Sequence, residues 1–190
     1  GGSITNIDQA YGSPKVAIEN MEIRNGLSGV QGSTISGFTL LDSRIINNSI
    51  GGGVAISSSS GELNIQNNTF TGNSANGANG AFWVAGNSGT VNLTNNLFEN
   101  NKNTVNLGNL QGNNAFIDNN IVRNNNSTTI GGANSVAGIA LSNAGYIQMT
   151  NNTVTNNISN TGGHTAGIRV EGSTGGMVFD NNEVAYNDGE

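Results

Sequence analysis

The stretch VNLTNNLFENN, residues 91–101, holds the pattern that decides the fold. Apolar and polar residues alternate over its first four positions, an Asn pair follows, and a second short alternation around Phe98 ends on another Asn. Alternation with a period of two is typical of a strand with one buried face, and Asn is typical of tight turns. The stretch therefore predicts two short strands joined by an Asn corner.

The same pattern recurs along the whole chain. The other clear copies are LNIQNNTFTGN (63–73), FIDNNIVRNN (116–125), IQMTNNTVTNN (147–157) and MVFDNNEVAYN (177–187), and two weaker ones are VAIENMEIRN (16–25) and FTLLDSRIINN (38–48). The second position of each pair marks one repeat, at Met21, Ser43, Asn68, Asn96, Asn120, Asn152 and Asn182. Repeats of this length indicate stacked units. We expect a single domain over residues 1–190.

Most repeats contain a third alternating segment. It is found at Val54–Ile56, Phe82–Val84, Val105–Leu107, Ile139–Leu141 and Ile168–Val170. Strands this short cannot bury a face alone, but stacked units bury one continuous core. The sequence thus predicts an all-β protein, a right-handed single-stranded parallel β-helix of about seven coils, each with three short strands. Aligned in this register, the inward positions form three apolar columns.

Composition excludes several other classes of protein. Gly and Asn number 29 and 37 of 190 residues, and both are poor formers of helix interiors. Lys and Arg total only six, and the net charge is −6. Both facts disfavour nucleic acid as a partner. No apolar run approaches the roughly 18 residues of a membrane span. The chain has no Cys, so neither disulfides nor thiolate metal sites are expected.

The Asn pairs fall at corners, and pairs in successive repeats lie one coil apart. Side-chain amides stacked in this way can donate to one neighbour and accept from the other, as in cross-β stacks. We therefore predict a structural Asn ladder, and prefer it to a sugar-binding role for the same rows. The predicted ladder residues are Asn67, Asn68, Asn95, Asn96, Asn119, Asn120, Asn151, Asn152, Asn181 and Asn182.

The units resemble the β-helix repeats of the pectate-lyase-like superfamily. The signature Asn-Asn-x-apolar-x-x-Asn is also similar to repeats of bacterial and archaeal surface proteins, adhesins and periplasmic NosD-like proteins. The resemblance covers about residues 16–187 and implies an extracellular or cell-surface location. It implies no single function, because the superfamily contains lyases, hydrolases, epimerases, phage tailspikes and non-enzymatic surface proteins.

Enzymes of that superfamily are expected to carry clustered carboxylates or a calcium site with a catalytic Arg. Here the twelve acidic residues are dispersed. Glu19, Asp118 and Asp180 share one outward column, but uncharged residues separate them. We therefore predict no catalytic residues, no metal and no cofactor, and His164 stands alone in a Gly-rich loop.

One outward column on the sheet of the third segment holds the best candidates for contacting a glycan. Trp83 could stack on a sugar ring, and Asn106 and Arg169 share its column. A contact with a partner protein or a covering loop is the favoured interpretation of Trp83, and glycan contact is the alternative.

The sequence shows no amphipathic helix that would cap either end of the β-helix. We expect either head-to-tail stacking of the chain on itself or coils of a longer chain beside it. The favoured function is a non-enzymatic extracellular structural or adhesive module, as a filament subunit or a segment of a larger surface protein. The alternative is a carbohydrate-binding or polysaccharide-degrading β-helix.

Overall fold

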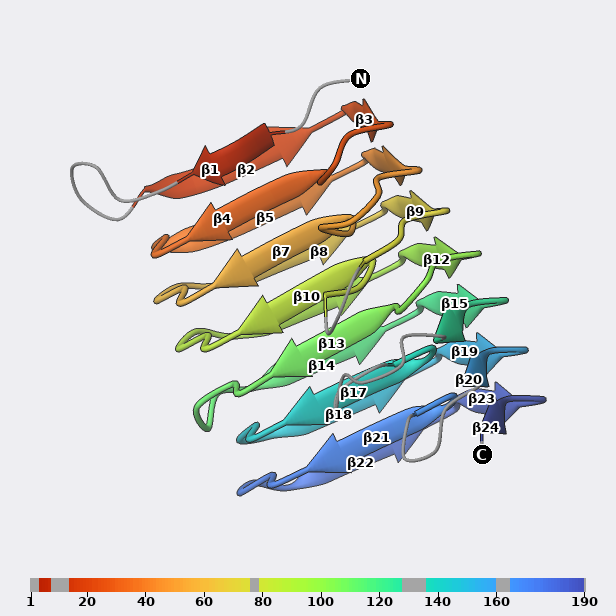
Figure 1. Ribbon diagram of the computed structural model, residues 1–190. Coiled ribbons are helices and arrows are strands. Elements are labelled where there is room, and N and C mark those ends of the chain that lie inside the picture. Colours follow the sequence, from red (N-terminus) through yellow and green to blue (C-terminus); the bar gives the residue numbers. More distant parts are fainter. Residues whose placement is uncertain (1–3, 8–13, 76–78, 128–135, 160–164, 190) are drawn as a thin grey trace.

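The computed structural model describes residues 4–7, 14–75, 79–127, 136–159 and 165–189, and all statements on structure below concern these ranges. They form strands and turns, stacked as three parallel sheets of seven strands and one small sheet of three (Figure 1). The described part contains no helix, and hence none that is long and apolar enough to cross a membrane. The fold is an all-β parallel solenoid, as the repeats predict.

We name the three large sheets A, B and C in the order in which the chain enters them. Sheet A contains β1 (Ile4–Ile7), β4 (Val30–Ser33), β7 (Val54–Ser57), β10 (Phe82–Ala85), β13 (Val105–Gly108), β17 (Ile139–Ser142) and β21 (Ile168–Glu171). Sheet B contains β2 (Lys15–Glu19), β5 (Gly37–Leu41), β8 (Leu63–Gln66), β11 (Val91–Thr94), β14 (Ala115–Asp118), β18 (Ile147–Thr150) and β22 (Met177–Asp180). Sheet C contains β3 (Glu22–Arg24), β6 (Arg44–Ile46), β9 (Thr69–Thr71), β12 (Leu97–Glu99), β15 (Ile121–Arg123), β19 (Thr153–Thr155) and β23 (Glu183–Ala185).

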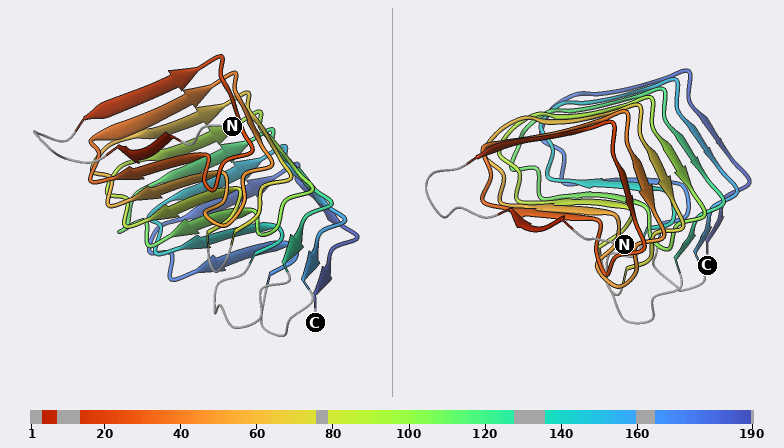
Figure 2. Two further views of the ribbon diagram at one scale, coloured as in Figure 1. Left: turned by 45° about the horizontal axis from the view of Figure 1, so that its top comes forward. Right: turned by 90° about the horizontal axis from the view of Figure 1, so that it is seen from above.

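One strand from each sheet makes one coil, and the seven strands per sheet equal the seven repeats of the sequence. Seen from above, successive coils lie over one another around a common interior, and the first and last coils lie at opposite ends (Figure 2). The strand Val30–Ser33 of sheet A has a counterpart in every later coil, but its alternation is too weak to mark it in the sequence.

The interior is filled by the three apolar columns that the register predicts. In sheet B, for example, Leu93 pairs with Ile65 on one side and Ile117 on the other, and all three are almost fully buried. In sheet C, Phe98 stacks on Phe70 with ring centroids 4.5 Å apart and 13° between the ring planes. These side chains belong to one continuous hydrophobic cluster that runs through the stack. Burial of this cluster is the main source of stability.

Each coil turns at three corners, and at each described corner the first residue after the strand is in the left-handed conformation. Between sheets B and C these residues are Asn20, Asp42, Asn67, Asn95, Asn119, Asn151 and Asn181. After sheet C they are Asn25, Asn47, Gly72, Asn100, Asn124, Asn156 and Tyr186. Between sheets A and B they are Thr34, Ser58, Gly86, Asn109, Asn143 and Gly172. Asn and Gly tolerate a positive φ best, which explains why they dominate the composition.

The sequence did not predict the fourth sheet. It consists of β16 (Asn126–Ser127), β20 (Ile158–Ser159) and β24 (Asp188–Gly189), which follow sheet C in the last three coils. Two-residue strands give too little alternation to be recognised in a sequence. This sheet extends the parallel pairing beyond the second Asn corner.

Candidate functional site: two asparagine ladders and the outer face of sheet A

The corner between sheets B and C carries a continuous ladder built from the second Asn of each pair. Asn96 donates its backbone N–H and one side-chain N–H to the side-chain oxygen of Asn120, both at 3.0 Å. The same double contact joins the members in the order Asn68, Asn96, Asn120, Asn152 and Asn182. The hydrogen bonds confirm the predicted ladder for these five residues.

The first Asn of each pair has a different role. Asn67, Asn95, Asn119, Asn151 and Asn181 are exposed and hold φ between 53° and 57°. Their side chains form isolated contacts, such as Asn181 to Asn151 at 2.6 Å and Asn67 to Asp42 at 3.0 Å, rather than a row of double contacts. The expectation that both members of the pair build the ladder is thus wrong for the first member. The first Asn of each pair instead makes the turn. Its left-handed conformation directs its side chain outward, away from the ladder.

A second ladder runs along the corner that follows sheet C. It is built from the Asn that closes each repeat, in the order Asn48, Asn73, Asn101, Asn125, Asn157 and Asn187. The recurring final Asn of the pattern is the signal that locates this ladder.

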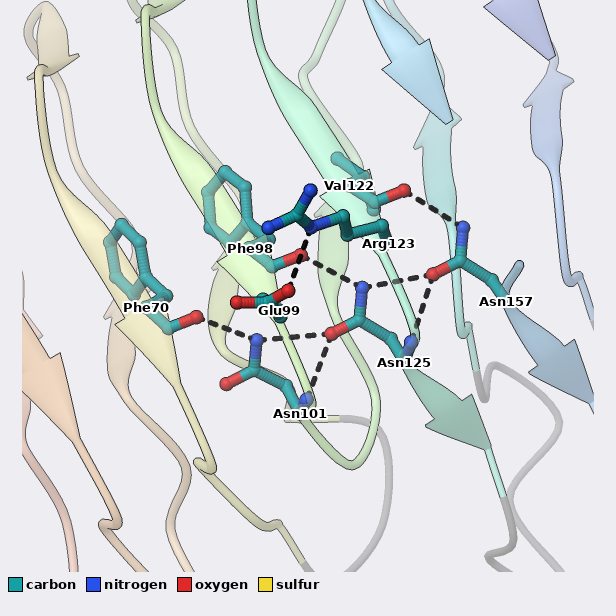
Figure 3. A network of polar contacts seen from close by, with 8 residues as sticks. All are labelled: Phe70, Phe98, Glu99, Asn101, Val122, Arg123, Asn125 and Asn157. Atoms are coloured by element: carbon teal, nitrogen blue, oxygen red, sulfur yellow. Dashed lines mark hydrogen bonds and ion pairs between the residues drawn. The ribbon is translucent and has the colours of Figure 1, made fainter. Parts of the chain in front are cut away.

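Each internal rung has all its side-chain hydrogen-bonding groups satisfied, as Figure 3 shows for Asn125 between its two neighbours. Asn125 donates to the Phe98 carbonyl at 3.0 Å and to the Asn157 side-chain oxygen at 2.9 Å. Its own side-chain oxygen accepts from the backbone and side-chain nitrogens of Asn101, at 2.8 and 3.1 Å. Two donors and two acceptor positions are the full capacity of the amide. Burying this row of polar side chains therefore costs little free energy.

The outer face of sheet A carries the candidate glycan contacts. The paired strands place Trp83, Asn106 and Arg169 in one outward column, as the sequence predicts. A hollow of about 260 Å³ lies on one side of Trp83, towards Asn106 and Arg169. A second, of about 210 Å³, lies on its other side, towards Gln31 and Asn79. These last two residues were not predicted as part of the surface, since the strand of Gln31 was not recognised.

The three predicted contacts differ in how they face the hollows. Trp83 is half-buried between small neighbours in its column, Ala55 on one side and Asn106 on the other. Asn106 is only 8% exposed, so it contributes mainly to the floor. The Nε atom of Arg169 lies 3.6 Å from a Glu171 carboxylate oxygen and has no hydrogen-bond acceptor among the described residues. This Nε atom is buried, and the hollow is lined by the two opposite charges of Arg169 and Glu171.

The outward carboxylates of sheet B do not converge. In the column of Asp118, Thr94 and Thr150 are its direct neighbours on the adjacent strands, and Asp180 follows only after Thr150. Asp118 accepts hydrogen bonds from Thr150 at 2.5 Å, from Asn119 at 2.9 Å and from Asn151 at 3.1 Å. These bonds tie Asp118 to its corner. Within the described ranges no group of three or more acidic or His residues could hold a metal ion. His164 lies outside the described residues.

Comparison with known proteins agrees with this architecture. The family model described as a right-handed β-helix region matches residues 3–96. No curated protein and no solved structure gives a significant match to the chain. Together, the family match, the parallel coils and the ladders identify the chain as a right-handed parallel β-helix repeat protein.

Proposed function

We propose that this protein is a non-enzymatic structural or adhesive module of an extracellular or cell-surface protein. The observation that carries the proposal is the use of Asn. Eleven Asn side chains are rungs of the two ladders, five in one and six in the other, where they hold coil to coil. A chain that uses eleven of its 37 Asn side chains to link its own coils is built to keep a rigid, elongated shape.

The hydrogen bonds of Asp118 support the same proposal. This carboxylate lies on the outer face of sheet B, where a general base would need an unengaged oxygen near its substrate. Three donors from the corner instead bind it. Asp118 thus fits a role in fixing the corner between sheets B and C.

A turnover assay tests the non-enzymatic part of the proposal. The purified protein would be incubated with polygalacturonate, pectin and alginate, and the release of reducing ends would be followed. We expect no turnover above a heat-denatured control. Turnover that Trp83→Ala and Arg169→Ala both abolish would contradict the proposal and favour a polysaccharide-degrading enzyme.

The outer face of sheet A favours saccharide binding as a second candidate function. Hollows lie on both sides of Trp83, and an aromatic ring beside a hollow can pack against the apolar face of a sugar. Arg169 lies three strands away in the same column, a separation of about 14 Å at the usual strand spacing. An extended acidic oligosaccharide would bridge the two residues, with its carboxylate beside the positively charged Arg169 side chain.

Calorimetric titration with oligogalacturonate and with a neutral oligosaccharide tests this second candidate. Binding of the acidic ligand should weaken about tenfold or more in Trp83→Ala and in Arg169→Ala. Phe116→Ala is the matched control, because Phe116 is an outward aromatic residue on sheet B. Equal loss of binding in all three variants, or no binding by the parent protein, would rule the candidate out.

A further inference from the structure

Both ladders have a direction. In every rung the backbone N–H and one side-chain N–H donate to the side-chain oxygen of the next coil towards the C-terminus. Asn152 contacts Asn182 in this way at 3.0 and 2.9 Å, and Asn157 contacts Asn187 at the same two distances. Each coil therefore presents amide oxygens towards the N-terminal end of the stack and amide donors towards the C-terminal end.

At the N-terminal end the ladders are terminated by residues without an amide side chain. Met21 and Gly26 occupy the two rung positions, and their backbone N–H groups donate to Ser43 Oγ and Asn48 Oδ1, both at 3.1 Å. Neither residue offers an oxygen acceptor to a coil on the outer side. The inward Ile18 and Ile23 of this coil are already buried, at 7% and 4% exposed.

The C-terminal end has the opposite character, because Asn occupies both rung positions. Asn182 and Asn187 use one side-chain hydrogen on the carbonyls of Met149 and Val154, both at 2.7 Å. No described residue accepts the backbone N–H of Asn182 or Asn187, or the second side-chain hydrogen of either.

The apolar columns are open at the same end. Met177, Phe179 and Val184 lie in the inward columns, yet they are 53%, 47% and 49% exposed. Their counterparts in the preceding coil, Ile147, Met149 and Val154, are fully buried beneath them. The same surface thus combines unused donors with uncovered core residues.

We propose that this C-terminal face, formed by β21, β22, β23, Asn182 and Asn187, binds a further parallel β-helix coil stacked in the same direction and bearing Asn at both corner positions. Such a coil would place two amide oxygens over the four unused donors and apolar side chains over Met177, Phe179 and Val184. This is the contact that adjacent coils already make at both corners from Asn68 and Asn73 onwards. The inference goes beyond the structural role proposed above and holds whether or not sheet A binds a saccharide.

A second copy of this chain does not fit that surface. In head-to-tail stacking the copy would present Met21 and Gly26, which have no side-chain oxygen for the donors of Asn182 and Asn187, and whose carbonyls are already used by the next coil. In tail-to-tail stacking the donors of one copy would face the same donors of the other. The ladder direction therefore disfavours the head-to-tail filament that the sequence left open, and selects a coil with different corner residues.

The test joins one further coil to the chain. A copy of residues 80–103, which contain Asn96 and Asn101, is joined to the C-terminus by a flexible Gly-Ser linker. The matched control joins the same copy with Asn96→Met and Asn101→Gly in the added segment alone, which reproduces the corners of the first coil. Amide hydrogen exchange at Asn182 and Asn187 and binding of a hydrophobic dye are measured for both proteins and for the parent.

We expect the Asn-bearing coil to slow exchange at Asn182 and Asn187 at least tenfold and to reduce dye binding, and the control coil to do neither. Equal protection by both coils, or protection by neither, would overturn the proposal. The parent chain should also remain monomeric in sedimentation velocity over a wide concentration range. A fibre or dimer of the parent in which the amides of Asn182 and Asn187 are protected would equally overturn it.

Discussion

Asn125 donates a side-chain hydrogen to the side-chain oxygen of Asn157 across 2.9 Å, one coil further along the stack (Figure 3). The backbone N–H of Asn125 donates to the same oxygen at 3.1 Å. One amide oxygen thus satisfies a main-chain and a side-chain donor of the neighbouring coil at once. Because both residues are almost fully buried, water cannot replace either contact.

Replacement of a central rung should therefore be among the most costly single changes in the protein. Asn125→Ala leaves the buried backbone and side-chain donors of Asn101, and the carbonyl of Phe98, without partners. Each unpaired buried group costs about 1 to 3 kcal/mol, so we expect a loss of about 3 kcal/mol or more in the free energy of unfolding. Urea unfolding followed by circular dichroism measures it.

The neighbouring residue supplies the control. Asn124 is exposed and has a φ of 54°, so Asn124→Gly keeps the turn and removes no rung. Its free energy of unfolding should stay within about 0.5 kcal/mol of the parent value. If both variants lost the same amount, the ladder would not be the source of the effect.

The first Asn of a pair should be sensitive to backbone shape and not to loss of its amide. Asn95 is exposed, has a φ of 56°, and its side chain makes no hydrogen bond to a described residue. Asn95→Gly should change stability by less than about 0.5 kcal/mol, while Asn95→Val should cost about 1 to 2 kcal/mol. Thermal unfolding of the two variants compares them directly. A larger loss in the Gly variant would show that the amide matters.

The sequence predicts the sheets and columns well because each depends on a simple periodic pattern. Inward Leu93 or Phe98 can be placed from alternation alone, since a slip by one residue would expose it. The separate roles of Asn95 and Asn96 cannot be predicted in this way. The two residues have the same chemistry, and only the left-handed conformation of the first decides which amide turns inward.

Two further features lie beyond the sequence pattern for other physical reasons. The corner between sheets A and B is occupied by residues as different as Thr34, Gly86 and Asn109, so no single residue type marks it in the sequence. The low exposure of Asn106 depends on how Trp83 and other neighbours pack over it, which alternation does not encode.

The stacked rings of Phe70 and Phe98 predict a strong effect in the core. Both side chains are fully buried, and the ring contact joins two adjacent coils. Phe98→Ala should lower the free energy of unfolding by about 3 to 5 kcal/mol through the lost burial and the cavity left behind. Leu97→Ala is the control, because Leu97 precedes it on the outer face and is only half-buried; it should cost less than half as much. Similar losses in both would argue against the inward assignment of Phe98.

Ile50 offers a change that should stabilise the protein. It is 54% exposed and has a φ of 70°, a conformation in which its branched side chain is strained. A non-Gly residue in such a region costs about 1 to 3 kcal/mol of stability. Gly removes this strain, but its larger conformational entropy in the unfolded chain cancels part of the gain. Ile50→Gly should therefore raise the free energy of unfolding by about 0.5 to 1 kcal/mol. Leu27→Gly, at an exposed loop position without a positive φ, should lower it by a similar amount. Urea unfolding of both variants would reveal the opposite signs, and a loss of stability in Ile50→Gly would contradict the strain at this position.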